Sequence, residues 1–86
     1  MTISDLICYL RQQLVIARND KNEKELQRLW DGINLFLESA YESGDKDVGA
    51  ILEAMGDSIR DSFMGVEWKS EMPSVEAIKA LDKRTG

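Results

Sequence analysis

The chain has 86 residues, of which 16 are acidic and 11 basic, and its net charge is −5. This length fits one domain over residues 1–86 with a thin core, because so short a chain buries only about 60–65% of its unfolded surface. The acidity argues against direct nucleic-acid binding, which needs clustered lysine and arginine. The single cysteine excludes an intrachain disulfide, and the lack of histidine leaves no expected zinc site or cofactor.

The first amphipathic pattern predicts a helix over about 3–19. Thr2 and Asp5 are spaced to form a capping box at its start. The residues expected to face inward are Ile3, Leu6, Ile7, Leu10, Leu14 and Ala17, with Tyr9 and Ile16 widening the apolar stripe. Cys8 and Val15 fall on the opposite side. Two explanations stay open: the helix is covered on two sides, or it takes part in a contact between subunits.

The longest uninterrupted helical pattern spans about 22–43. Asn22 is its expected N-cap, with Glu25 three residues later, and Gly44 is its expected end. The short polar turn at 18–22 forces this helix to run antiparallel to the first. Its apolar arc contains Leu26, Leu29, Trp30, Ile33, Phe36, Leu37, Ala40 and Tyr41.

A third helix is predicted over about 46–64, with a seam at Val48, Ile51, Leu52, Met55, Ile59 and Phe63. Gly49 and Gly56 flank this seam, and we interpret them as a groove for a bulky side chain such as Trp30. Pro73 precedes a short last helix, predicted over 74–82. The seams of the three long helices alternate steps of four and three, which is typical of left-handed bundles. The sequence therefore predicts an all-α fold: a small antiparallel three-helix bundle with a short C-terminal fourth helix, alone or as a homodimer.

Two rows of carboxylates form the first candidate binding surface. They comprise Asp31, Glu38 and Glu42 on the second helix and Glu53, Asp57 and Asp61 on the third. Like charges one turn apart destabilise a helix by about 0.2–0.5 kcal/mol per pair. Two explanations of these rows stay open. They form a solvated face without a binding role, or they form a surface that binds a basic protein partner. In its extreme form such a surface imitates a nucleic-acid backbone.

The second candidate surface is the apolar tail, made of Phe63, Met64, Trp68 and Met72. Aromatic and methionine side chains are enriched at binding hot spots. The alternative is that Trp68 folds back as a lid over the open end of the bundle.

Catalysis has little support, because histidine is absent and Cys8 has neither a neighbouring base nor a second thiol. We expect Cys8 to be a small, half-buried apolar residue. A carboxylate-based enzyme or metal binder using Glu53, Asp57 and Asp61 is the weakest of three hypotheses.

The leading hypothesis is a non-catalytic acidic protein that binds, and inhibits or regulates, a larger protein with a basic surface, including a nucleic-acid-binding one. Small proteins of phages and mobile elements share this composition. The runner-up is an assembly or adaptor subunit that docks through Trp68 and its neighbours. No stretch resembles a signal peptide or a membrane span, so we expect a cytoplasmic protein without membrane contact.

Overall fold

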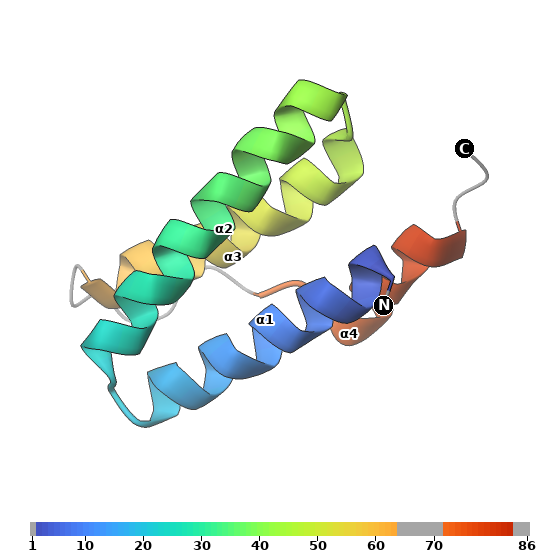
Figure 1. Ribbon diagram of the computed structural model, residues 1–86. Coiled ribbons are helices and arrows are strands. Elements are labelled where there is room, and N and C mark those ends of the chain that lie inside the picture. The colour runs from blue at the N-terminus through green and yellow to red at the C-terminus, as the bar shows by residue number, and fades with distance from the viewer. Residues whose placement is uncertain (1, 64–71, 84–86) are drawn as a thin grey trace.

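The computed structural model describes residues 2–63 and 72–83, and within these ranges the structure is helical and has no strand. The helices are α1 (Ile3–Asn19), α2 (Glu23–Ser43), α3 (Lys46–Phe63) and α4 (Val75–Lys79), which continues into the 3-10 helix η1 (Ala80–Lys83) (Figure 1). The all-α prediction is therefore confirmed. The bounds of α1, α2 and α3 agree with the predicted ranges to within one residue, apart from position 64, which lies outside the described residues. The last helix, predicted over 74–82, is α-helical only over Val75–Lys79 and continues as η1.

Local capping interactions explain where the helices begin and end. The Asp5 backbone N–H donates to the Thr2 hydroxyl and the Thr2 N–H donates to the Asp5 carboxylate, each at 3.2 Å, so the predicted capping box is present. The Asn22 side chain accepts from the Glu25 N–H at 3.2 Å. Gly44 ends α2 with a φ of 78°, a left-handed conformation that glycine adopts without a steric penalty.

The helices pack unevenly. Antiparallel α2 and α3 share the most extensive contact, whereas α1 diverges from α2 beyond the turn that joins them (Figure 1). The C-terminal elements α4 and η1 lie against α1. Helix α1 is therefore covered on two sides within one chain, as one of the two explanations has it, but this cover does not reach Tyr9 and Ile16, which are 56% and 46% exposed. Cys8 is half-buried and packs against the core, as expected.

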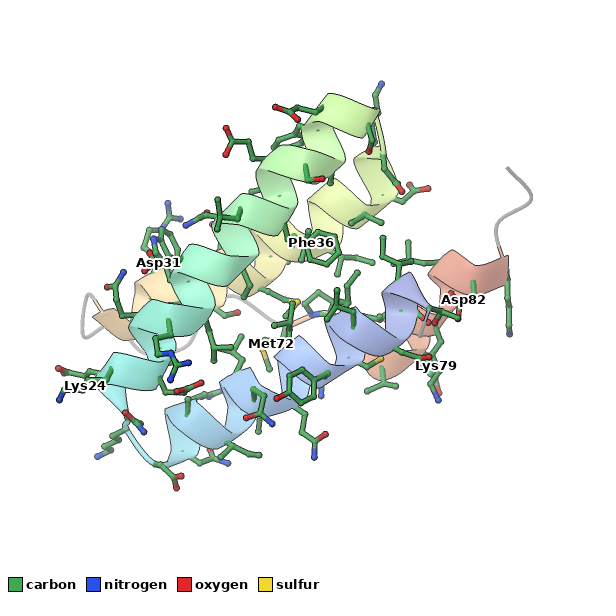
Figure 2. All side chains as sticks on the ribbon, viewed as in Figure 1. Lys24, Asp31, Phe36, Met72, Lys79 and Asp82 are labelled. Carbon is green, nitrogen blue, oxygen red and sulfur yellow. The ribbon has the colours of Figure 1, made fainter. Side chains whose placement is uncertain are left out.

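The core is formed by all four α-helices and η1. The predicted seam of α3 is confirmed, because Val48, Leu52, Met55 and Ile59 are fully buried. Phe36 and Met72 pack against the core from the interior of the molecule (Figure 2). The inward placement of Ile3 and Leu6 is wrong: they are 37% and 36% exposed. The reason is that α1 diverges from α2 towards its N-terminus, so the inner stripe loses its cover there.

The C-terminal segment is fastened to α1 at both ends. Arg11 Nε donates a hydrogen bond of 2.8 Å to the carbonyl oxygen of Pro73, ahead of α4. At the other end the buried Ser4 hydroxyl donates to Asp82 Oδ2 at 2.5 Å. Between these bonds, Ile78 is fully buried. The last helix is thus an integral part of the fold.

Candidate functional site

Two aromatic side chains of α2 lie against two glycines of α3. A Cβ atom added at Gly56 would lie 3.7 Å from Trp30 Cζ3, and one added at Gly49 would lie 3.1 Å from Tyr41 Cε1. Trp30 therefore lies beside Gly56, as the sequence predicts, but a methyl group would fit there without displacing the ring, whereas at Gly49 the missing side chain makes room for Tyr41. Only at Gly49 does the lack of a side chain allow an aromatic ring of α2 to lie this close to the α3 backbone.

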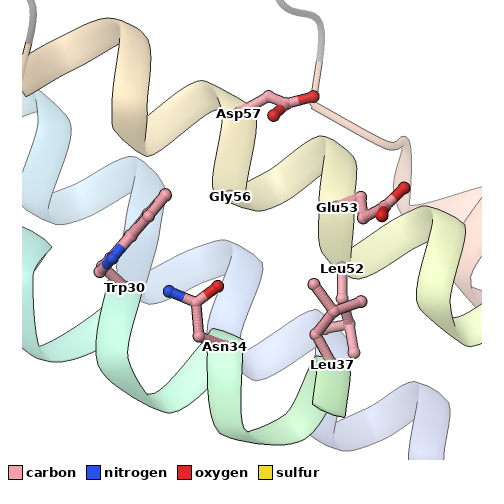
Figure 3. A pocket seen from close by; sticks show the side chains of 7 residues that line it. All are labelled: Trp30, Asn34, Leu37, Leu52, Glu53, Gly56 and Asp57. Carbon is pink, nitrogen blue, oxygen red and sulfur yellow. The ribbon is translucent and has the colours of Figure 1, made fainter. Parts of the chain in front are cut away.

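A pocket of about 270 Å³ opens along this contact between α2 and α3 (Figure 3). Trp30 and Asn34 point from α2 towards α3, and Glu53 and Asp57 project from α3 (Figure 3). The complete lining is Trp30, Asn34, Leu37, Leu52, Glu53, Gly56 and Asp57. The pocket thus combines an aromatic ring and two leucines with one amide and two carboxylates.

Each carboxylate of the pocket contacts a side chain of the same chain. Glu53 accepts a hydrogen bond from the Tyr41 hydroxyl, so this contact crosses from α2 to α3. The bond to Glu53 is the largest cause that raises the pKa of Tyr41, followed by burial and by repulsion between the Glu53 charge and the phenolate. Asp57 Oδ1 lies 3.3 Å from a terminal guanidinium nitrogen of Arg60, and both side chains are more than half exposed.

The six predicted acidic residues differ in their relation to the pocket. Glu53 and Asp57 are exposed and line the pocket. Asp61 is half-buried and does not line it. The three α2 residues are exposed but are not part of the pocket lining; they are Asp31, Glu38 and Glu42. The structure therefore brings together two of the six.

Most of the predicted apolar tail falls where the structure gives no description. Met64 and Trp68 lie outside the described residues, and Phe63 is described only as the last residue of α3. Met72 is half-buried and packs against the core, so part of its side chain serves the fold. The alternative, that Trp68 forms a lid, concerns a residue outside the described ranges.

Sequence reasoning did not identify Trp30, Asn34 and Tyr41 as site residues. Trp30 and Tyr41 both belong to the predicted apolar arc of α2; Trp30 packs against the core, whereas Tyr41 is 53% exposed. Periodicity did not indicate that the two rings lie beside acidic residues of α3. The two glycines of α3 were the available signal, because they showed which side of α3 faces large side chains. Glu53 and Asp57 lie next to the glycine side of α3, so their position predicts an acidic site beside the aromatic side chains of α2.

In the ranges 2–63 and 72–83, no three Cys, Asp or Glu side chains come together in a way that would hold a metal ion. No helix described for this chain has the length and apolar character needed to cross a membrane.

Comparison of the chain with protein-family models, with curated proteins and with solved structures finds no match. The fold and the pocket define an acidic, all-helical protein with a carboxylate-rimmed aromatic pocket between two antiparallel helices. Any functional conclusion for this chain therefore depends on the chemistry of that pocket and of the surface around it.

Proposed function

We propose that this chain is a non-catalytic protein that binds a basic surface of a larger protein and thereby inhibits or regulates it. The observation that carries the proposal is the pairing of exposed Glu53 and Asp57 with Trp30 at one pocket. Carboxylates favour a cationic partner and steer its approach. A half-buried tryptophan adds the apolar contact area that is typical of binding hot spots.

The favoured partner class is a nucleic-acid-binding protein, because such proteins have the most extensive basic surfaces. Glu53 and Asp57 are four residues apart on α3, a rise of about 6 Å along the helix. This spacing is similar to that of successive phosphates, and the net charge of −5 supports the same attraction over a longer range. We expect such a protein to act in the cytoplasm, in the manner of small regulators from phages or mobile elements.

Self-association through α1 is part of the proposal. Leu6, Tyr9, Gln13 and Ile16 recur at steps of three, four and three along one side of α1. Three of them are apolar and exposed: Leu6 at 36%, Tyr9 at 56% and Ile16 at 46%. This spacing suits helix-on-helix packing. A second copy of the chain would cover the stripe and add to a thin core.

The proposal is tested by capturing proteins from cells of the chain's own source. The bait is the full chain carrying Glu53→Lys and Asp57→Lys, compared with the unaltered chain, and captured proteins are quantified by mass spectrometry. The matched control carries Asp20→Lys and Glu76→Lys, which change the net charge equally at exposed positions outside the pocket. Circular dichroism confirms that each bait is folded.

We expect a basic protein that is captured by the unaltered chain and by the control, but not by the pocket variant. Loss of capture in both variants would show that only overall charge matters. Retention in both would contradict the proposal. A Trp68→Ala bait tests the adaptor hypothesis, because that hypothesis alone predicts loss of the partner on removal of the indole.

A further inference from the structure

The pocket between α2 and α3 suits one flat cationic side chain. We propose that it receives an arginine side chain of the partner protein, an inference that rests on the proposed function and specifies its contact. The occupant follows from three properties of the pocket: its size, its aromatic wall and its paired carboxylates.

The size of the pocket favours a single side chain. Its volume of about 270 Å³ is below the range of about 300–1,000 Å³ that is usual for sites of drug-sized molecules. The half-buried Leu37 offers apolar surface to the methylene groups of a long side chain. Trp30 offers an indole ring, the aromatic group on which a guanidinium stacks most favourably.

The polar groups of the pocket match a guanidinium better than an ammonium. Glu53 and Asp57 are one helical turn apart, so two acceptors stand on one side of the pocket, and the Asn34 amide adds an acceptor from α2. A guanidinium has five N–H donors in a planar fork and can bond to more than one of these groups while it stacks. A lysine ammonium is compact, more strongly hydrated and unable to stack in this way.

The existing partners of the two carboxylates leave room for this contact. The Tyr41 hydroxyl occupies one of about four acceptor positions on Glu53. The Arg60 guanidinium already lies 3.3 Å from Asp57, but this pair is exposed on both sides and is therefore weak. An arginine that also contacts Trp30 and Glu53 would compete effectively with Arg60 for Asp57.

The test uses the full chain labelled with nitrogen-15 and a blocked tripeptide, acetyl-Gly-Arg-Gly-amide, as the probe. The indole N–H signal of Trp30 reports binding, and a Trp68→Phe chain assigns it, because the protein has two tryptophans. Tripeptides with lysine or with citrulline in place of arginine are the controls. Citrulline has nearly the same shape as arginine but no charge.

We expect a saturable shift of the Trp30 signal with the arginine peptide, binding at least fivefold weaker with lysine, and no saturable shift with citrulline. A Glu53→Gln, Asp57→Asn chain should bind the arginine peptide at least tenfold more weakly. The control chain, Asp31→Asn with Glu38→Gln, should bind it like the unaltered chain, since these carboxylates lie outside the pocket. The dispersion of the amide signals verifies that both variants are folded.

Absence of saturation with arginine at tens of millimolar, or equal binding of citrulline, would overturn the inference. If either result is obtained while Glu53→Lys with Asp57→Lys still abolishes partner capture, the proposed function stands and only the arginine contact is wrong. If the arginine peptide binds as expected but capture does not depend on Glu53 and Asp57, the pocket is an arginine site and the proposed function is wrong.

Discussion

The indole ring of Trp30 lies over Gly56, close enough that a new Cβ atom at this glycine would make an ordinary contact of 3.7 Å with Cζ3. We therefore predict that Gly56→Ala raises the free energy of unfolding by about 0.5–1 kcal/mol, because alanine is the better helix former and the ring has no need to move. Chemical denaturation measures the change. Gly32→Ala is the control, since nothing lies within 4 Å of an added Cβ there.

A loss of stability in Gly56→Ala, with the expected gain in Gly32→Ala, would mean that Trp30 packs more tightly on α3 than the structure shows. In that case the pocket beside the ring would be smaller too, so this measurement also checks the site. Equal gains at both positions agree with the described contact.

The hydrogen bond from Tyr41 to Glu53 leads to a prediction about pH. This bond raises the pKa of Tyr41 above its ordinary value of 10.0, so the folded state favours the protonated phenol. Its contribution to stability is fully present below the pKa of an unfolded tyrosine, about 10, and is lost as the pH rises through the higher folded pKa. Tyrosinate absorbance in a Tyr9→Phe chain, where Tyr41 is the one remaining tyrosine, measures the titration.

Glu53→Gln in the same Tyr9→Phe background should lower the pKa of Tyr41, because the acceptor loses its charge and no longer repels the phenolate. An unchanged titration curve would show that the contact between α2 and α3 at this point is not maintained in solution.

Local signals in the sequence were sufficient for the helices. Thr2, Asn22 and Gly44 mark helix ends through contacts within a few residues, and each acts in the structure as predicted. The spacing of the apolar residues also gave the buried side of α3. It did not predict that Ile3 and Leu6 are exposed. Periodicity shows which side of a helix is apolar, but not along how much of its length a neighbouring helix covers that side.

The site was harder to predict because it depends on the register between two helices. All six acidic residues look alike in the sequence, yet only Glu53 and Asp57 line the pocket. What distinguishes them is the seating of Trp30 against Gly56, which is a contact between residues far apart in the chain. Helical spacing alone cannot supply such a contact.

The C-terminal helix supplies a third prediction. Ile78 is fully buried, so Ile78→Ala should lower the free energy of unfolding by about 2–4 kcal/mol through lost burial and the cavity left behind. Val75→Ala, at a position 40% exposed on the same helix, should change it by less than about 1 kcal/mol. Thermal or chemical denaturation compares the two. Similar small losses in both variants would show that α4 is not docked on α1.

The exposed stripe on α1 gives the last prediction, which concerns the homodimer. If a second chain covers Tyr9 and Ile16, then Ile16→Glu places an unpaired charge in an apolar interface and should shift the protein to a monomer. Leu35→Glu introduces the same charge on α2 at a position that is 70% exposed and outside the stripe, so it should leave the dimer intact. Sedimentation equilibrium over a range of concentrations measures both. A strictly monomeric unaltered chain would contradict the homodimer, whereas dissociation by Leu35→Glu alone would place the interface on α2 instead of α1.

Because the pocket is formed by α2 and α3 without α1, the Ile16→Glu monomer should still bind the arginine peptide. This result would separate self-association from partner recognition.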